Sequence, residues 1–319
     1  MEKLSSVPGP ALATLWREPF SDDRWVYERK LDGVRCLAYC DGGRVWIRSR
    51  SGGDQGRAFP EVVEALEAQR CPSFVVDGEV VAFDGAQTSF AALQPRIHLT
   101  SAERARRTGV AIYYYVFDLL HLDGHSTRSL PLRERKALVR DLFAWDDPLR
   151  FSAHRNADGR GYLRLACERG WEGLIAKRAD APYPSGRSRD WLKLKCEQGQ
   201  EFVIGGWTDP QGSRVGFGSL LLGYYDQAGE LVYAGKVGTG FNTALLRSLH
   251  NRLNVLERAT PAFRRGPLLP KKDVHWAEPR LVGQVWFTEW TRDGQLRHPR
   301  FLGLRDDKAP RDVVRERPA

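Results

Sequence analysis

The chain has 319 residues, 42% of them hydrophobic and 28% charged, which is enough for two soluble globular domains with well-formed cores. No apolar run is long enough to span a membrane, and the N-terminal residues lack the basic start, apolar stretch and cleavage site of a secretion signal. The formal net charge of +9, with a pI near 9.4, favours a polyanionic partner, nucleic acid above all, although a basic surface is weak support for one by itself.

The part of the chain before Cys196 predicts strands interrupted by helices. In the expected strands apolar and polar residues alternate, whereas in the expected helices apolar residues recur at helical spacing. Pro60 fits the start of the first helix and Gly170 the end of the last. The expected strands are 24–31, 34–40, 44–50, 172–178 and 191–196, together with a strand that begins the segment 111–124. The segment 73–85 is either a pair of strands around Asp77-Gly78 or one bent strand. The expected helices are 59–69, 128–140 and 159–171.

After Cys196 the chain changes to short strands broken by glycines and Asp-Gly turns, with one helix expected over 242–259. Five or so short strands within about 120 residues suit a small β-barrel of the oligonucleotide-binding type. We therefore expect an α+β protein of two domains, with the boundary near residue 197.

The five cysteines give little sign of cross-links or metal binding. Their number is odd and no Cys-x-x-Cys pair is present, which argues against both a disulfide framework and a zinc site. Cys36 and Cys40 share one face of an expected strand, where they are best interpreted as small buried side chains. We therefore expect the chain to be reduced and cytoplasmic.

Basic residues gather in two segments, 103–107 and 128–140. Leu130, Leu138 and Leu142 give the second segment an apolar side at helical spacing. For each segment alone a solvated helix face is the simpler interpretation, but the excess of positive charge over the whole chain suggests contacts with phosphates.

Lys30 stands in the segment "YERKLDGVRC" (27–36), where an apolar-polar alternation meets an Asp-Gly turn. One interpretation is a surface lysine at the end of a strand. The other is a nucleophile, which needs burial or nearby positive charge to lose its proton, because the ordinary pKa of lysine is about 10.4. A lysine that attacks phosphorus also requires basic groups for phosphate, a carboxylate for a divalent metal and an aromatic ring for a base. The chain has many residues of each kind, so their presence alone does not decide between the two.

The order of several motifs along the chain favours the nucleophile. They are "KLDGVR" (30–35), "SRSG" (49–52), "DGEVVAFD" (77–84), "FDLLHLDG" (117–124), "EGLIAKR" (172–178), "RSRDWLKLKC" (187–196) and "FTEWTRDGQLRHPRFLGLRDDK" (287–308). In this order they resemble the covalent nucleotidyltransferases, and among them the ATP-dependent DNA ligases, in particular the ligase module of bacterial end-joining ligase D or a stand-alone relative. The stretch 88–97 also resembles a helix start of that module, which Thr88 or Ser89 can cap.

The resemblance implies a role for each matched residue. Lys30 is expected to take AMP as a phosphoramidate, and Glu172 to work with a divalent metal. The residues implied to contact the nucleotide are Arg35, Arg50, Arg187, Glu79 (the ribose), Phe117 (the adenine), and Lys193 and Lys195 (the α-phosphate). The residues implied to orient the pyrophosphate leaving group are Arg305 and Lys308.

Some of these residues also have a purely structural interpretation. Phe117 can be core packing in an apolar strand, Glu79 can be a solvated carboxylate, and Glu172 can cap a helix end. Neighbouring arginines on the same strand face leave two positions open, Arg48 or Arg50 and Arg187 or Arg189.

The resemblance implies an adenylation (nucleotidyltransferase) domain over 1–196, with antiparallel sheets and flanking helices, and an OB-fold barrel domain over 197–319. The implied activity is an ATP-dependent DNA ligase that uses Mg²⁺ or Mn²⁺ and joins 5′-phosphate and 3′-hydroxyl ends in non-homologous end joining. The implied partners are nicked or broken duplex DNA, an end-binding protein such as Ku and a repair polymerase. We expect a monomer, at the bacterial nucleoid rather than a membrane, with a hinge near residue 197.

Other assignments fit the chain less well. An mRNA-capping guanylyltransferase shares the lysine motif, but the segment 287–308 argues against it, and an RNA ligase need not have such a barrel domain. An NAD-dependent ligase lacks support because no four-cysteine zinc site is present. A non-catalytic nucleic-acid-binding protein would not need Lys30, Glu172, Lys193 and Lys195 together. Met1 favours a free-standing enzyme over an excised domain.

Overall fold

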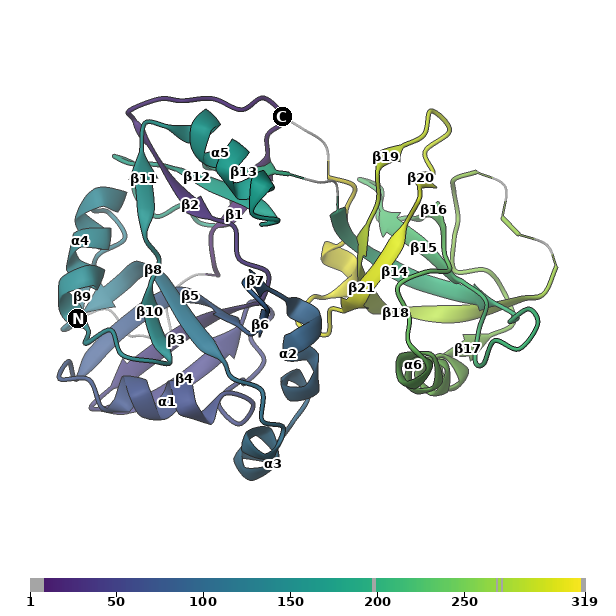
Figure 1. Ribbon diagram of the computed structural model, residues 1–319, viewed down its shortest axis with the longest axis horizontal. Coiled ribbons are helices and arrows are strands. Elements are labelled where there is room, and N and C mark those ends of the chain that lie inside the picture. Colours follow the sequence, from purple (N-terminus) through teal and green to yellow (C-terminus); the bar gives the residue numbers. More distant parts are fainter. Residues whose placement is uncertain (1–8, 197–198, 268, 271, 317–319) are drawn as a thin grey trace. The chain divides into compact units, whose positions relative to one another are not determined.

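The computed structural model describes residues 9–196, 199–267, 269–270 and 272–316. The chain divides into two compact units, one formed by the described residues up to Cys196 and the other by those from Gly199 onward (Figure 1). The hinge expected near residue 197 lies outside the described residues. None of the helices described is long and apolar enough to cross a membrane.

Two sheets form the first unit, and most of their strand pairs are antiparallel. The six-stranded sheet contains, in order, β10 (Leu149–Phe151), β8 (Tyr113–Leu122), β5 (Ser73–Val81), β3 (Val34–Asp41) and β4 (Arg44–Ser49), with β9 (His125–Ser126) beside β8. The five-stranded sheet contains, in order, β1 (Leu12–Leu15), β13 (Arg187–Lys195), β12 (Gly173–Arg178), β2 (Trp25–Arg29) and β11 (His154–Asn156). A two-stranded ribbon joins β6 (Phe83–Asp84) and β7 (Gln87–Thr88).

Five helices flank these sheets among the described residues (Figure 1). Ser89 caps α2 by accepting a hydrogen bond from the Ala92 amide (3.3 Å), and Pro60 begins α1, as the sequence predicts. The helices are α1 (Pro60–Glu67), α2 (Phe90–Ile97), α3 (Ala102–Arg107), α4 (Leu132–Leu142) and α5 (Gly159–Glu168).

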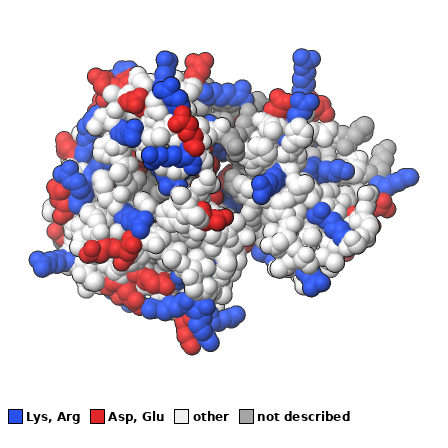
Figure 2. Space-filling model, in the orientation of Figure 1, with Lys and Arg blue, Asp and Glu red and all other residues white. Residues whose placement is uncertain are grey.

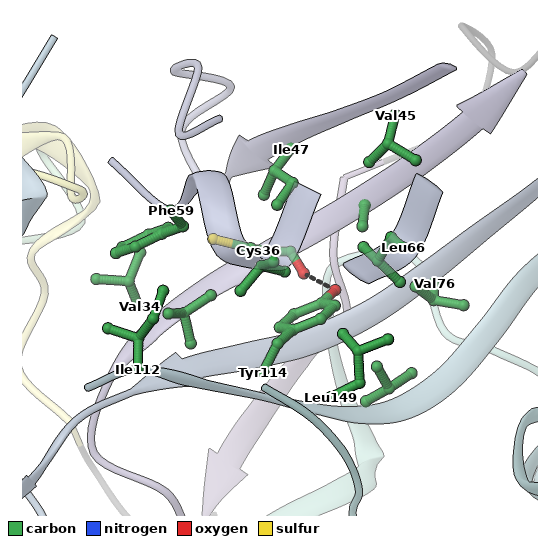
Figure 3. Close-up of a cluster of buried hydrophobic side chains, with 14 of the residues drawn as sticks. Val34, Cys36, Val45, Ile47, Phe59, Leu66, Val76, Ile112, Tyr114 and Leu149 are labelled. Carbon is green, nitrogen blue, oxygen red and sulfur yellow. Dashed lines mark hydrogen bonds between the residues drawn. The ribbon is translucent and has the colours of Figure 1, made fainter. Parts of the chain in front are cut away.

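One face of the six-stranded sheet packs into the main core of the first unit (Figure 3). Cys36 and Cys40 lie in this core, which confirms that they are small buried residues. The buried Tyr114 hydroxyl donates a hydrogen bond to the Cys36 carbonyl (2.9 Å), so its polar atom is satisfied there.

Helix α4 buries a different face from the one that its leucines predict. Leu138 is 37% exposed, whereas Arg135 and Lys136 point inward and are fully buried. The prediction of a solvated basic face is therefore wrong for these two residues, because each finds a buried carboxylate: Arg135 pairs with Asp118 and Lys136 with Glu28.

Helix α3 shows the solvated basic face that we expect. Arg107 pairs with Glu103 one turn earlier (3.1 Å), and Arg106 pairs with Glu64. Figure 2 likewise shows acidic and basic side chains interspersed over the first unit in the view drawn. Part of the basic excess is thus compensated locally.

The second unit is built on one larger sheet. Its order is β16 (Leu231–Val237), β15 (Leu220–Tyr225), β14 (Gly199–Thr208), β18 (Val274–Trp286) and β17 (Glu257–Arg258), with β21 (Arg300–Leu304) beside β18. A ribbon of β19 (Glu289–Trp290) and β20 (Leu296–Arg297), the helix α6 (Thr243–Val255) and the short 3₁₀ helix η2 (Pro310–Asp312) complete it.

The helix and the short strands expected in the second unit are confirmed. Asn242 caps α6, and Leu246, Leu249 and Leu253 pack it onto the sheet. The expected barrel differs in one respect, since no pairing of the strands described closes this sheet on itself.

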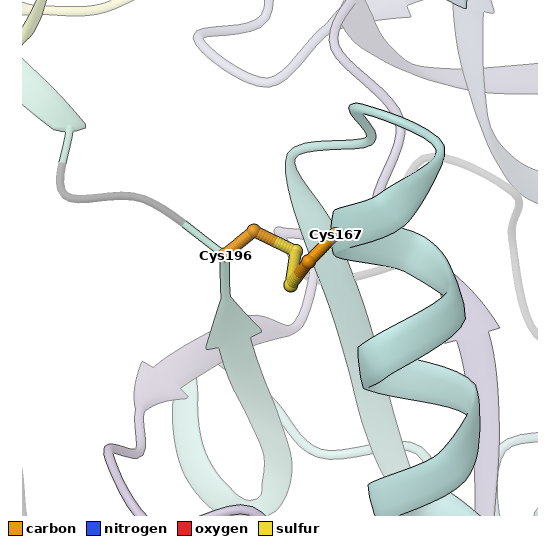
Figure 4. The surroundings of a disulfide bond; sticks show 2 residues. All are labelled: Cys167 and Cys196. Atoms are coloured by element: carbon orange, nitrogen blue, oxygen red, sulfur yellow. A yellow bond between two sulfur atoms is a disulfide. The ribbon is translucent and has the colours of Figure 1, made fainter.

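The cysteines give a second correction. Cys167 of α5 and Cys196, directly after β13, form a disulfide with their Cα atoms 5.3 Å apart (Figure 4). The expectation of a chain without cross-links is wrong here, because the fold brings a helix end next to a strand end. The two cysteines are 29 residues apart in sequence, and such a separation matches no motif that would predict a disulfide.

Candidate functional site

The two sheets of the first unit meet at a cluster where apolar and charged side chains mix. Phe117 of β8 and Trp191 of β13 come from different sheets, and their rings contact each other edge to face. The ammonium group of Lys177 lies 4.1 Å from the centroid of each ring, and the Arg35 guanidinium lies 4.8 Å from Phe117 and 5.3 Å from Trp191. Positive charge and aromatic surface are therefore brought together between the sheets.

The segment after β2 holds Lys30 in place through its aspartate and glycine. The Asp32 carboxylate accepts a hydrogen bond from the first amide of α2 at Phe90 (3.0 Å). A Cβ atom on Gly33 would lie 2.2 Å from the Val80 carbonyl oxygen, so only glycine fits this approach to β5. The Lys30 amide donates to the Gly173 carbonyl of β12 (2.9 Å). The residue pattern of this motif thus has a direct structural reason.

The Lys30 side chain forms an ion pair with the carboxylate of Glu172. The two side chains are 20% and 27% exposed, so they are partly sheltered but still open to a ligand. Glu172 is not the cap of α5, because that helix ends with Arg169 in the cap position. The structure therefore brings together the predicted nucleophile and the predicted metal-associated carboxylate.

Arg35 is held by a carboxylate that the sequence interpretation did not single out. It donates two hydrogen bonds to the fully buried Asp77 (2.7 and 2.6 Å), which also accepts one from the Tyr183 hydroxyl (2.6 Å). Burial disfavours the charged guanidinium, but Asp77 outweighs it and raises the pKa of Arg35. Arg35 is therefore a fixed, permanently charged donor beside Phe117.

A buried group of one carboxylate and two ammonium ions lies near Arg35, since its Lys177 contacts the same Trp191 ring. Glu28 of β2 accepts hydrogen bonds from Lys136 (2.7 Å) and Lys177 (2.9 Å), and Lys136 also donates to the Ser152 carbonyl (2.9 Å). Burial alone would raise the pKa of Glu28, but the two ammonium groups hold it below its ordinary value. Burial lowers the pKa of Lys177 to about 8, although Glu28 opposes that shift. The group carries one excess positive charge in the fully ionised state.

The remaining predicted residues of the first unit fall in two places. Glu79 stands opposite Arg35 in the register of β5 and β3, and the Arg50 amide donates to the Arg35 carbonyl (3.2 Å). Lys193 and Lys195 stand opposite Ile175 and Gly173 of β12, next to Glu172. These positions adjoin the Lys30 and Arg35 groups, and Arg48, the alternative to Arg50, is exposed and donates to the Gly52 carbonyl.

Arg187 lies far from Lys195 along the same strand. It begins β13, whereas Lys195 ends it, and eight residues of strand span about 26 Å. Its guanidinium donates to the Ala13 carbonyl of β1 (2.7 Å).

Arg305 and Lys308 belong to the second unit, where each pairs with a carboxylate of that unit. Arg305 donates two hydrogen bonds to Asp307 (both 2.8 Å), and Lys308 donates one to Glu201 (2.8 Å).

Sequence reasoning missed Glu28, Asp77, Lys136 and Lys177. A weak signal was present for three of them, since Glu28, Asp77 and Lys177 each directly follow a run of apolar residues in a strand. Lys136 gave none, because a lysine in a basic helical segment is normally solvated.

The side chains at this site fit a divalent metal that is bound partly by the substrate. In the part of the chain that the structure describes, no group of three or more His, Cys, Asp or Glu side chains is arranged to hold a metal ion. Mg²⁺ is commonly bound through one or two carboxylates together with substrate phosphates, and Glu172 can supply such a carboxylate. The residues therefore fit a metal that arrives with a phosphorylated substrate.

Comparison with protein families gives matches over both units. A family described as "ATP dependent DNA ligase domain" matches residues 11–195, and one described as "ATP dependent DNA ligase C terminal region" matches residues 213–308.

Curated relatives give the same picture. The multifunctional non-homologous end joining protein LigD of Pseudomonas aeruginosa is 40% identical over 316 residues, which cover 97% of this chain and 37% of that protein. The protein of the same name from Mycobacterium bovis is 37% identical over 299 residues, covering 92% of this chain and 38% of the relative. The chain therefore spans less than half the length of these relatives.

Among solved structures, a mycobacterial DNA ligase D complexed with ATP and MES is similar with a TM-score of 0.69 and 35% identity. The match covers 97% of this chain and 98% of that one. The ligase domain of M. tuberculosis LigD is similar with a TM-score of 0.52, the same identity and the same coverage. The expected pair of an adenylation domain and an OB-fold domain is thereby confirmed as the fold class.

Proposed function

The chain belongs to the ATP-dependent DNA ligases, and from that premise we propose that it seals 5′-phosphate/3′-hydroxyl breaks in duplex DNA through AMP carried on Lys30. The observation that carries this proposal is the Lys30–Glu172 ion pair, in the same unit as the contacts of Arg35 and Lys177 with the ring of Phe117. A nucleophile, a carboxylate, cations for phosphate and an aromatic surface for a base lie within one unit.

In the first step the Lys30 amine attacks the α-phosphorus of ATP, the P–N bond forms, and pyrophosphate leaves with the electrons of the broken P–O bond. Lys30 attacks as the neutral amine, after it has given up a proton. We assign the positive charges of Arg35, Lys193 and Lys195 to the phosphates of the nucleotide. The same charges stabilise the negative charge that develops on the phosphoryl oxygens. Glu172 would hold a divalent ion, Mg²⁺ or Mn²⁺, which would supply further neutralisation of the phosphates.

The nucleotide is held by residues from both sheets. We assign the ring of Phe117, already in contact with Trp191, to the adenine, because base–aromatic stacking contributes about 1–3 kcal/mol per base. We assign Glu79 to the ribose, and its position opposite Arg35 supports this. We assign Arg50 to the nucleotide as well, since its backbone amide donates to the Arg35 carbonyl. Arg187 is assigned to DNA or leaving-group phosphate rather than to the α-phosphate, since it lies at the other end of β13.

In the second step AMP passes from Lys30 to the 5′-phosphate of DNA, and in the third the 3′-hydroxyl attacks that phosphate and AMP leaves. Arg305 and Lys308 act in the first step only, on the pyrophosphate. Lys30 reacts with ATP in the first step and with DNA in the second. We therefore infer that the second unit gives way to DNA after the first step, by a movement of the domain 197–319 relative to the domain 1–196.

The setting of the reaction is proposed from the relatives. Several are named as non-homologous end joining proteins, so we assign the chain to the joining of nicked or broken duplex DNA in repair. An end-binding protein such as Ku and a repair polymerase are the partners that this role requires. The enzyme then acts as a monomer on DNA in the bacterial cytoplasm, and its basic surface supports phosphate binding.

The test is a denaturing gel with α-labelled ATP and, separately, α-labelled GTP. Protein stripped of AMP with pyrophosphate is labelled in the presence of Mg²⁺ and then chased with a nicked duplex. We expect label from ATP only, its loss as joined strands appear, and no label on Lys30→Ala. Lys272→Ala, an exposed lysine of the second unit, is the matched control and labels normally. Label from GTP, or label that never leaves for DNA, would contradict the proposal.

A further inference from the structure

The Cys167–Cys196 disulfide lies close to the residues proposed to act in catalysis (Figure 4). Cys167 is in the last turn of α5, and Cys196 directly follows β13, which carries Lys193 and Lys195. The bond therefore ties the helix that precedes Glu172 to the strand that lies beside it.

Backbone contacts connect this bond to Lys30 in two steps. The Cys196 amide donates to the Glu172 carbonyl (3.0 Å), and the Lys30 amide donates to the carbonyl of the next residue, Gly173 (2.9 Å). The Glu172 side chain in turn pairs with Lys30. The disulfide thus adds a covalent tie to a short segment, Cys167 to Glu172, that backbone hydrogen bonds also hold at both ends.

The two sulfurs differ from the other cysteines in accessibility. Cys167 is exposed, whereas Cys36, Cys40 and Cys71 are buried, and burial raises the pKa of the Cys40 and Cys71 thiols. Small thiols and disulfides in solution can therefore reach the Cys167–Cys196 pair and not the others. Compartments that hold bacterial DNA keep thiols reduced, so a disulfide there is formed and broken rather than permanent.

We propose that Cys167 and Cys196 form a thiol–disulfide modification site that takes a low-molecular-weight disulfide as oxidant, and that its closed form holds Glu172 beside Lys30. This inference rests on the proposed function. The Cys167 thiolate attacks the small disulfide, forms a mixed disulfide and releases one small thiol. The Cys196 thiolate then attacks the Cys167 sulfur, forms the protein disulfide and releases the second small thiol. Two protein thiols lose two electrons and two protons, which the small disulfide takes up.

Opening the bond leaves the fold intact, because β12 and β13 remain paired along five residue pairs. It removes the covalent tie from the segment before Glu172, so the carboxylate is held less well. We expect reduction to slow lysyl-AMP formation about threefold to tenfold, less than the roughly hundredfold that a 1 Å misplacement can cause.

The experiment compares full-length protein incubated with glutathione disulfide and with dithiothreitol. Thiols are counted by alkylation and mass spectrometry, and the rate of labelling by α-labelled ATP is measured on the same samples. We expect the oxidised protein to hold two fewer thiols and to label faster. Cys167→Ser should label at the reduced rate in both conditions, and Cys71→Ala, which keeps the pair, should respond like the wild type.

Two results would overturn the inference: equal labelling rates in samples whose thiol counts differ by two, or no protein disulfide after oxidation. A failure of the proposed function is distinguishable from both, since the protein would then show no label in either redox state while its thiol count still changed.

Discussion

Replacing Asp118 by asparagine should strongly destabilise the first unit. Asp118 and Arg135 are both 0% exposed, and Arg135 donates to both carboxylate oxygens (2.6 and 2.9 Å). The amide of Asp118→Asn has one oxygen for three N–H donors, two from Arg135 and one from the Leu119 backbone, and turns its own NH₂ group toward a guanidinium that keeps its charge. Removing one partner of a buried ion pair costs about 3–5 kcal/mol. At about 2–4 °C per kcal/mol for a unit of this size, the midpoint of thermal unfolding should fall by about 6–20 °C.

The assay is thermal unfolding followed by circular dichroism, with Asp141→Asn as the matched control. Asp141 pairs with Arg140 on the same helix, but both side chains are exposed, so this change should leave the midpoint unchanged. The reasoning would be refuted by an Asp118→Asn midpoint that equals that of the control, because the buried pair would then contribute no more than a solvated one.

Three further predictions concern the nucleotide, the leaving group and pH. Phe117→Leu should raise the KM for ATP in the labelling reaction about tenfold, as expected for a lost stacking contact; an unchanged KM would show that Phe117 is core packing only. Lys308→Ala should slow lysyl-AMP formation but not the sealing of pre-adenylylated nicked DNA, and equal slowing of both would argue against a role in the first step. The pKa of Glu28 is lower in the folded protein than its ordinary value of 4.5, so its stabilisation is present above that pH and is lost as the pH falls below it. Unfolding of the wild type should therefore show an acid dependence that Glu28→Gln lacks, and identical pH profiles would exclude the effect.

Much of the site could be predicted because the motifs coincide with strand ends and strand faces. Lys30 and Glu172 are 142 residues apart in sequence, but β2 and β12 are neighbours in one sheet, and this pairing places them together. Lys193 and Lys195 share a face because side chains alternate along a strand. The family resemblance gave the order of these segments, and local alternation gave their faces.

The features that were missed depend on long-range packing. The inward face of α4 carries Arg135 and Lys136 because they pair with Asp118 and Glu28 of two strands. The helical spacing of leucines does not reveal these partners. Asp77 is needed only because Arg35 enters a buried position between the sheets. The disulfide likewise follows from the approach of α5 to the end of β13. In each case the ion-pair or disulfide partner is distant in sequence and becomes a neighbour only in the folded chain.

The most direct test of this account is to locate AMP on the protein. Stripped protein would be incubated with ATP and Mg²⁺, digested at neutral pH to preserve the P–N bond, and its peptides analysed by mass spectrometry. The account predicts an AMP adduct on Lys30 and on no other lysine. An adduct on Lys177, Lys193 or Lys195 instead, or an adduct-free Lys30 in protein that still joins nicked DNA, would contradict it.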